Sequence, residues 1–203
     1  PLAFDDDDKH LIVASNANRA NMAIFRFNPE NGQFVELIAQ HPQYDLGGSP
    51  QGEPIGELIR DRDTHAILGM RIDADKYETI WFDADMAKAQ ATLDASLPGR
   101  TNLVRRSAAG KPLLVYSFSD TSPGRFYLFH QASRNIEEIG PSRPWLEGKL
   151  ANVKPFRLKT RDGLEIPSSV VLPKGYKAGD KLPTIVHVHG GPMGRDVRLG
   201  GLY

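Results

Sequence analysis

The sequence of 203 residues contains no cysteine. A disulfide framework, a thiolate zinc site and a cysteine nucleophile are therefore excluded within this chain. The absence fixes no compartment, because many exported proteins also lack disulfides. For a soluble chain of this kind, the cytoplasm and the periplasm both remain open.

The sequence also lacks an excess of either charge. Its 25 lysines and arginines balance 25 aspartates and glutamates, whereas nucleic-acid-binding proteins usually carry a basic excess. No apolar run approaches the ~18 residues that a membrane-spanning helix needs. With 40% hydrophobic and 25% charged residues, the composition is typical of a globular chain of one or two domains. Neither nucleic acid nor a membrane is expected as a partner.

Helical periodicity is scarce. The best candidate is Asp85–Ala95, whose first residue is the candidate N-cap and whose Met86, Ala89 and Leu93 recur at helical spacing. A weaker candidate covers Glu53–Arg60. The 19 glycines and 15 prolines make up a larger fraction of the chain than the average of about 12%. This excess favours many turns and short strands.

Strand signals dominate the first two thirds of the chain, in three sets of apolar or alternating runs joined by turns. The turn Asn28–Gly32 is the clearest, because Asn and Pro start it and Asn-Gly supplies a positive φ. The first set is Leu11–Ser15, Met22–Phe27 and Phe34–Ala39; the second is Ala66–Ile72, a turn at Asp73–Lys76 and Thr79–Asp83; the third is Leu113–Ser119, a turn at Ser122–Gly124, Phe126–Gln131, a turn at Ser133–Asn135 and Ile136–Ile139.

The three sets recur at a loose period. Their central aromatic residues, Phe25, Trp81 and Tyr127, lie 56 and 46 residues apart. A period near ~50 residues in short antiparallel strands is typical of β-propeller blades. A β-sandwich, whose strands also come in hairpins, is the alternative. We expect a mostly β fold in which residues 1–145 form about three blades of an incomplete propeller.

The pattern changes near residue 145. Pro141–Pro144 is typical of a linker, and an Asp-Gly turn at Arg161–Gly163 joins the expected strands Val153–Lys159 and Ile166–Leu172. Thr184–His189 is a nearly continuous β-branched run, which is typical of a strand buried on both faces. We expect residues 146–203 to be the opening strands of an α/β domain.

The expected strand leads directly into the run His189-Gly190-Gly191-Pro192. Consecutive glycines after a core strand allow backbone N–H groups to approach a developing negative charge. A loop of this type supplies one oxyanion-hole donor in α/β-hydrolases. A plain turn between a strand and a loop explains the same residues without any chemistry.

The surrounding segments resemble the prolyl oligopeptidase family of serine peptidases (peptidase S9), especially its branch of acylaminoacyl-peptidases and dipeptidyl-aminopeptidase-like enzymes. The resemblance is specific over residues 153–195 and diffuse before them. It is carried by Phe156–Pro167, Leu172–Gly175, Leu182-Pro183 and His189–Pro192, and more weakly by Asp8–Asn16 and Ile24–Phe27.

The resemblance implies a β-propeller followed by an α/β-hydrolase domain that cleaves short peptides with a serine, an aspartate and a histidine. It places His189, Gly190, Gly191 and Pro192 in the oxyanion-hole loop, with the N–H of Gly191 as the direct donor. No cofactor and no metal are implied.

The sequence departs from this family in one decisive respect: it contains no Gly-x-Ser-x-Gly nucleophile elbow. Gly47-Gly48-Ser49-Pro50-Gln51 lacks the closing glycine. The catalytic serine, aspartate and histidine are therefore expected after Tyr203. We expect a fragment, comprising the end of a propeller and the start of a hydrolase domain, that is inactive alone and aggregates or pairs with a complementary polypeptide.

Two rival functions remain open at this stage. A partial propeller can bind peptides or partner proteins through its loops without any chemistry. An esterase-type α/β-hydrolase would also use an oxyanion loop, although the propeller-like half favours peptides, and short peptides remain the expected substrate of the complete enzyme.

For the other motifs, a structural role explains the residues as well as a binding role does. His187 and His189 face one side of an expected strand and can begin a metal site, but strand-end packing explains them equally well. Asp5–Lys9 fits a calcium chelator or a polar turn. Arg60–Asp63 and Arg105-Arg106 fit a site for substrate termini or solvated, mutually paired charges. The aromatic cluster Phe126, Tyr127 and Phe129 is typical of a core.

Overall fold

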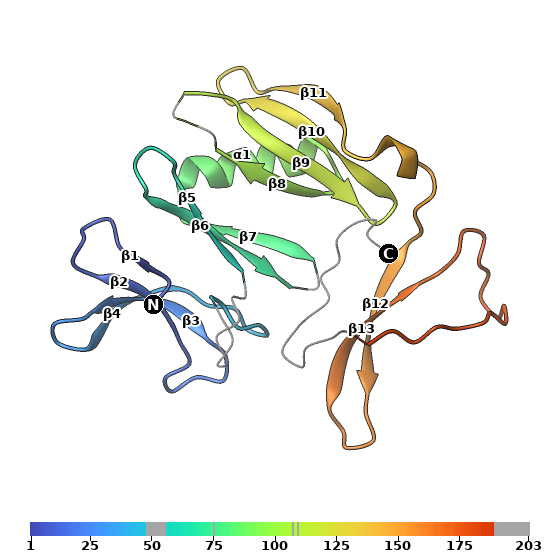
Figure 1. Cartoon of the computed structure of the whole chain (residues 1–203), viewed down its shortest axis with the longest axis horizontal. Coiled ribbons are helices and arrows are strands. Elements are labelled where there is room, and N and C mark those ends of the chain that lie inside the picture. Colours follow the sequence, from blue (N-terminus) through green and yellow to red (C-terminus); the bar gives the residue numbers. More distant parts are fainter. Residues whose placement is uncertain (48–55, 75, 107, 109, 189–203) are drawn as a thin grey trace. The chain divides into compact units, whose positions relative to one another are not determined.

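The computed structural model describes residues 1–47, 56–74, 76–106, 108 and 110–188 (Figure 1). The chain is predominantly β, as the sequence predicts: within these ranges it forms thirteen strands, one α-helix and one short 3₁₀ helix. The strands pair in antiparallel fashion, from β1 with β2 to β12 with β13. No helix in the described ranges is long and apolar enough to span a bilayer.

The first sheet is a four-stranded meander in the order β1-β2-β3-β4. Its strands are β1 (Ala3–Phe4), β2 (Leu11–Ser15), β3 (Ala23–Asn28) and β4 (Gln33–Ala39). The hairpin predicted around Asn28–Gly32 is confirmed. The Asn28 side chain accepts the Glu30 N–H at 2.9 Å, and the Gly32 N–H donates to the Asn28 carbonyl at 3.0 Å.

The second sheet is a three-stranded meander of β5 (Glu57–Arg60), β6 (Ile67–Asp73) and β7 (Tyr77–Trp81). The expectation of a helix at Glu53–Arg60 is wrong over its described part. Residues 57–60 pair with β6 as an edge strand, from Glu57 opposite Arg71 to Arg60 opposite Ile67. The tertiary pairing overrides a weak helical pattern.

The predicted helix is confirmed as α1 (Ala84–Ser96), with Met86, Ala89 and Leu93 buried as expected. Its cap is Asp83 rather than Asp85. The Asp83 carboxylate accepts the Met86 N–H at 2.8 Å, which satisfies a backbone donor of the first helical turn. Asp85 lies inside the helix, where its carboxylate is 3.5 Å from the Lys88 ammonium.

The third sheet is a four-stranded meander in the order β8-β9-β10-β11. Its strands are β8 (Thr101–Arg105), β9 (Leu113–Ser119), β10 (Ser122–His130) and β11 (Asn135–Pro141).

The turn predicted at Ser122–Gly124 is wrong, because these residues begin β10 and the chain turns at Asp120 and Thr121 instead. Gly124 has φ +105°, and a Cβ there would lie 2.4 Å from the ring of Tyr116. The Tyr116 hydroxyl donates to the Pro123 carbonyl at 2.9 Å. This contact holds a turn-like sequence in the sheet.

The spaced aromatic residues take equivalent places in the three meanders. Phe25 lies on β3, Trp81 on β7 and Tyr127 on β10, and each of these is the third strand of its sheet. The loose period in the sequence therefore corresponds to a repeated structural unit.

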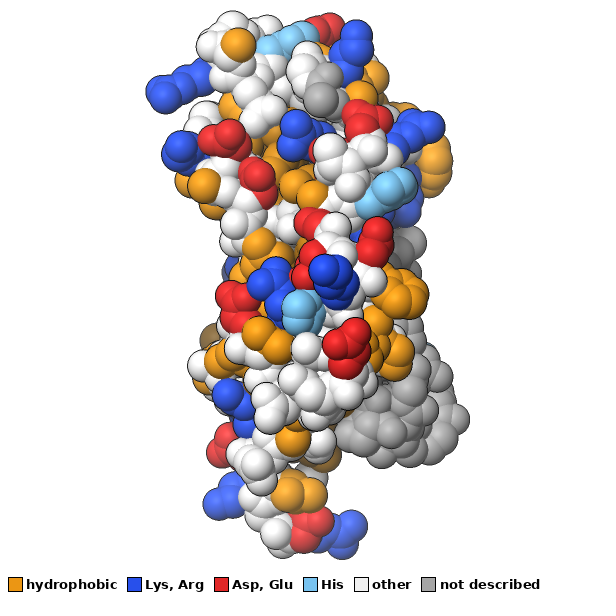
Figure 2. Space-filling view, turned by 90° about the vertical axis from the view of Figure 1, so that its left-hand side faces the viewer, with side chains coloured by type: hydrophobic (Ala, Val, Ile, Leu, Met, Phe, Trp, Pro, Cys, Tyr) orange, Lys and Arg blue, Asp and Glu red, His pale blue; other side chains and the backbone are white. Residues whose placement is uncertain are grey.

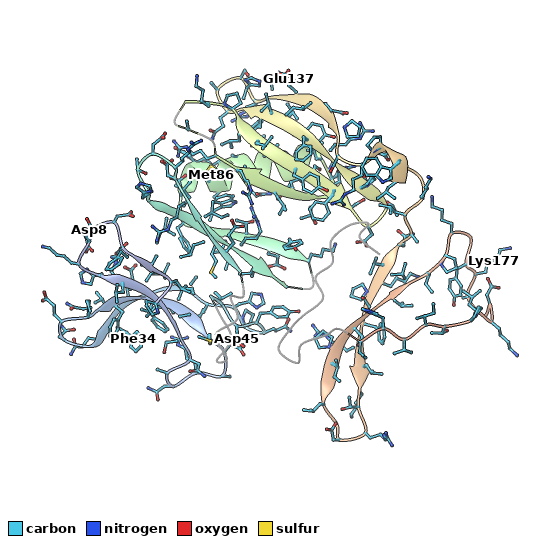
Figure 3. All side chains as sticks on the ribbon, in the orientation of Figure 1. Asp8, Phe34, Asp45, Met86, Glu137 and Lys177 are labelled. Carbon is cyan, nitrogen blue, oxygen red and sulfur yellow. The ribbon has the colours of Figure 1, made fainter. Side chains whose placement is uncertain are left out.

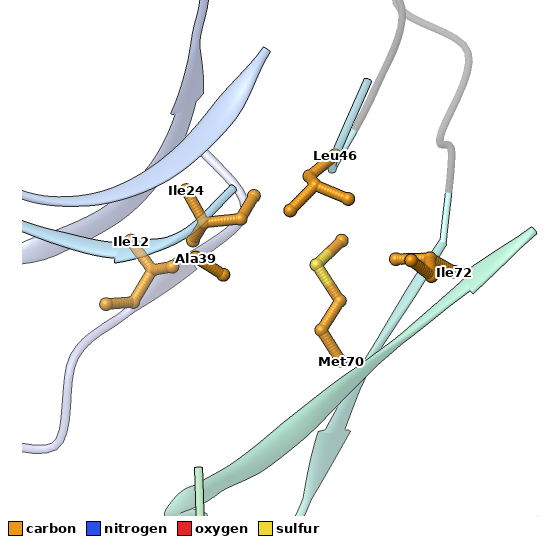
Figure 4. Close-up of a cluster of buried hydrophobic side chains, with 6 residues drawn as sticks. All are labelled: Ile12, Ile24, Ala39, Leu46, Met70 and Ile72. Carbon is orange, nitrogen blue, oxygen red and sulfur yellow. The ribbon is translucent and has the colours of Figure 1, made fainter. Parts of the chain in front are cut away.

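The first two sheets share one hydrophobic cluster (Figure 4). Ile12, Ile24, Ala39 and Leu46 come from the first sheet and the segment that follows it, while Met70 and Ile72 come from β6. Each of these side chains is at most 7% exposed. The two sheets thus cover one another with aliphatic side chains, and the second contributes the thioether of Met70.

The 3₁₀ helix η1 (Pro144–Leu146) and a two-stranded hairpin follow the third sheet. The hairpin consists of β12 (Val153–Lys159) and β13 (Glu165–Val171), close to the predicted bounds. Because β11 extends to Pro141, the predicted linker Pro141–Pro144 is shorter than expected.

The strand predicted at Thr184–His189 is not present at residues 184–188, and His189 lies outside the described residues. A strand exists only as a member of a hydrogen-bonded ladder, and no described strand pairs with this segment. Ile185, Val186 and Val188 are therefore 93%, 84% and 81% exposed.

The chain divides into two compact units, residues 1–93 with 105–113 and residues 94–104 with 114–203. The shared hydrophobic cluster belongs to the first unit, and the hairpin β12–β13 belongs to the second. The boundary expected near residue 145 stays a prediction.

Met70→Ala tests the shared cluster. Met70 is 1% exposed, so its truncation removes buried apolar contacts and leaves a cavity that costs about 2–5 kcal/mol of unfolding free energy. Urea unfolding followed by circular dichroism measures the loss. The control Val35→Ala changes a half-exposed position on β4 and is expected to cost about 0.5 kcal/mol. Equal effects of the two substitutions would contradict the shared cluster.

Candidate functional site

The predicted oxyanion loop, His189, Gly190, Gly191 and Pro192, lies outside the described residues. The structure therefore describes only the elements that lead to it. These are the hairpin β12–β13 and the segment from Leu172 to Val188, which runs without helix or strand to the start of the loop.

The hairpin is held by seven consecutive residue pairs, from Val153 opposite Val171 to Lys159 opposite Glu165. Its turn is the predicted Arg161–Gly163. The Thr160 N–H donates to the Leu164 carbonyl at 2.9 Å, and Asp162 accepts a hydrogen bond from the Thr160 hydroxyl. That hydroxyl, followed by the Leu164 N–H, lowers the pKa of Asp162.

One face of the hairpin is mostly apolar and, among the described residues, only partly covered, with Lys154 and Ser168 as its polar members. Paired residues of an antiparallel ladder point to the same side, so Phe156, Leu158, Ile166 and Val170 share a face. Their exposed fractions are 46%, 49%, 44% and 37%. An isolated two-stranded hairpin is marginally stable in water and needs a third strand or a helix against its apolar face.

The open end of the hairpin borders a hollow of about 250 Å³. Most of its walls come from the segments before β12 and after β13. A hydrogen bond of 3.3 Å from the Leu172 N–H to the Asn152 carbonyl joins these segments. The lining residues are Thr121, Leu150, Ala151, Asn152, Lys154, Leu172, Pro173, Lys174, Gly175 and Tyr176. No motif in the sequence marks this hollow, because only the β12–β13 register brings residues 150–154 beside residues 172–176.

The acidic segment Asp5–Lys9 forms the polar turn between β1 and β2. The Asp7 carboxylate accepts the N–H groups of Lys9 and His10 at 2.9 Å and lies 2.6 Å from His10 Nδ1. The N–H and ring of His10, followed by the N–H of Lys9, lower the pKa of Asp7. These contacts give the segment a structural role.

The metal-site hypothesis gains no support from the described ranges. No group of three histidines, cysteines, aspartates or glutamates within them is arranged to hold a metal ion. The hypothesis at His187 and His189 depends on a residue outside those ranges.

Arg105 and Arg106 are paired with carboxylates, whereas Arg60 donates to the Phe4 carbonyl at 3.4 Å. The Arg106 guanidinium lies 3.4 Å from Asp61, and that of Arg105 lies 3.7 Å from Glu57. On the face drawn in Figure 2, basic and acidic side chains are interspersed rather than gathered by sign. The mutually paired charges expected as the plainer explanation are therefore present.

Two of the three aromatic residues on β10 are part of the core, and the third, Phe126, is half-buried. Tyr127 and Phe129 are 8% and 2% exposed, and the Phe126 ring centroid is 5.0 Å from that of Tyr116. Such rings are not available as a stacking platform for a ligand.

Comparison with known proteins shows a distant relative. No protein-family model matches the chain. The chain is 28% identical over 204 aligned positions to dipeptidyl aminopeptidase BIII of Pseudoxanthomonas mexicana. The alignment covers 94% of this chain and 27% of that protein. The chain is thus distantly homologous to a peptidase and spans about a quarter of its length.

The buried carboxylate of Asp61 generates a pH prediction. It accepts the N–H groups of Asp63 and Thr64 at 2.9 Å each. These two hydrogen bonds lower its pKa below the usual 3.8, and the nearby Arg106 adds to the effect. A lowered pKa in the folded state stabilises the fold above the unfolded-state value, and this stabilisation is lost as pH falls through the folded-state value.

We therefore expect Asp61→Asn to lower the melting temperature at pH 7, with the difference from the unmodified chain shrinking below about pH 4. Differential scanning calorimetry across this pH range measures both effects. Asp8→Asn, in the β1–β2 turn (Figure 3), is the control and is expected to change little. A pH-independent difference for Asp61→Asn would contradict the ionic role of this carboxylate.

Proposed function

We propose that this chain is a segment of a prolyl oligopeptidase-family serine peptidase that hydrolyses short peptides. The observation that carries the proposal is the similarity to a dipeptidyl aminopeptidase along 94% of the chain. Because that relative is a dipeptidyl aminopeptidase, a peptide substrate is favoured over the ester substrate of the rival hydrolase. Because the chain spans 27% of that protein, the activity is proposed for a longer polypeptide.

The order of the elements supports this family. Three antiparallel meanders, each with an aromatic residue on its third strand, precede the hairpin β12–β13. We interpret the meanders as propeller blades over residues 1–145. Residues 146–203 would then be the opening of the α/β-hydrolase domain.

The loop His189–Pro192 is proposed as part of the oxyanion hole, with the Gly191 N–H as a direct donor. A serine hydroxyl of the longer polypeptide would attack the peptide carbonyl carbon while a histidine accepts its proton. The Gly191 N–H would stabilise the negative charge on the carbonyl oxygen. The histidine would protonate the leaving amine, and water would then hydrolyse the acyl-enzyme.

A complementary polypeptide is the proposed partner. Large apolar side chains are exposed along the hairpin and continue through Ile185, Val186 and Val188. We interpret these exposed apolar side chains as a site of association with other protein. The proposed cover is the remainder of the hydrolase domain.

The function is tested with dipeptidyl 4-nitroanilide substrates. We expect no turnover by the 203-residue chain, because an oxyanion donor without a nucleophile and a base cannot carry out covalent catalysis. A longer polypeptide that contains this chain and a Gly-x-Ser-x-Gly elbow should release nitroaniline. Turnover by the short chain, or ester hydrolysis without peptide hydrolysis by the longer polypeptide, would contradict the proposal.

Within the longer polypeptide, Gly191→Pro removes the proposed donor N–H, whereas Gly191→Ala retains it as the matched control. Loss of one oxyanion donor is expected to lower kcat about 100-fold to 1,000-fold with little change in KM. Equal kcat values for the two variants would refute the assignment of this N–H.

A further inference from the structure

We propose that the hollow at the open end of the β12–β13 hairpin binds a small organic anion, with a carboxylate or phosphate near Lys154 and Lys174 and an apolar body beside Leu150 and Leu172. The hollow lies wholly within the second unit. The inference does not depend on the proposed peptidase function.

The walls of the hollow are set by backbone contacts. Lys154 pairs with Val170 in the hairpin register, and Leu172 is joined to Asn152 by a backbone hydrogen bond of 3.3 Å. Beyond Leu172 the chain makes a tight turn, in which the Tyr176 N–H donates to the Pro173 carbonyl at 3.2 Å. Gly175 has φ +83°, as the third residue of a type II turn requires. This turn returns Lys174 and Tyr176 to the hollow's wall.

The charge of the hollow has one sign. Lys154 and Lys174 are its only charged lining residues. Within the part of the chain that the structure describes, neither lysine forms an ion pair. Arg26, Arg71 and Arg125, by contrast, each contact a carboxylate. Both lysines are exposed, so an anion held by them would gain two screened, charge-assisted contacts.

The remaining lining residues match a ligand with one polar and one apolar end. Asn152, Thr121 and Tyr176 add an amide, a hydroxyl and a phenol to the lining, and groups of these types donate hydrogen bonds to oxyanions. Leu150 is 7% exposed, and Leu172 is half-buried. A volume of about 250 Å³ has room for a small organic ligand rather than a single water molecule.

The proposal is tested with the 203-residue chain and N-acetyl-leucine, by saturation-transfer difference NMR. This experiment observes the ligand, so association of the chain does not prevent it. Because each lysine contributes one screened, charge-assisted contact, Lys154→Gln and Lys174→Gln should each weaken binding about threefold to tenfold. The double variant should lose more.

Lys177→Gln is the matched control. Lys177 lies in the same loop after β13 (Figure 3) but does not line the hollow. Its substitution should leave the affinity unchanged. An equal loss in all three single variants would mean general attraction to positive charge and would overturn the site.

Two further probes distinguish the parts of the ligand. N-acetyl-leucinamide lacks the carboxylate and inorganic phosphate lacks the apolar body, so both should compete more weakly than N-acetyl-leucine. Equal binding of the amide would overturn the role of the lysines. Equal binding of phosphate would overturn the role of the leucines, and undetectable binding of N-acetyl-leucine would overturn the site as a whole.

Discussion

Every sheet in this chain depends on what lies against its apolar face. In the first unit, two sheets bury the apolar side chains of one another. Two meanders place Ile12, Ile24 and Leu46 against Met70 and Ile72 and exclude water from all of them. Burial of such side chains contributes roughly 1.5–3 kcal/mol each, which offsets the entropy cost of ordering short strands.

No second sheet or helix among the described residues buries the apolar side chains of the hairpin β12–β13. Its backbone ladder is complete from Val153 to Lys159, yet the side chains on its apolar face remain about half exposed. A hydrogen-bonded ladder without apolar cover contributes little net stability, because its groups bond equally well to water in the unfolded chain. The same constraint explains the exposed run at residues 184–188, whose β-branched side chains favour a strand but have no ladder to join.

Local chemistry made most of the fold predictable from the sequence. Leu11–Ser15, Leu113–Ser119 and Val153–Lys159 have the predicted bounds, because apolar runs flanked by turn residues define strands without tertiary information. The errors occurred where a particular side-chain hydrogen bond decided the outcome. Tyr116 holds Ser122–Gly124 in a strand, and Asp83 rather than Asp85 accepts the Met86 N–H and caps the helix.

The candidate site was less predictable than the fold. The motif at His189–Pro192 can be recognised in sequence, but the chemistry proposed for it requires a nucleophile and a base that no motif in the sequence supplies. The lysine-lined hollow shows the opposite case. Neither Lys154 nor Lys174 belongs to a motif, and only the register of β12 against β13 brings their segments together.

Amide hydrogen exchange of the 203-residue chain, at a concentration where sedimentation shows a monomer, tests the central claim most directly. We expect slow exchange in β2, β3 and β6, because side chains of these strands form the shared cluster. Fast exchange is expected throughout β12 and β13, since local opening of an uncovered hairpin costs little free energy. Protection of β12 and β13 equal to that of β3 in the monomer would contradict the claim that this hairpin requires cover from other polypeptide.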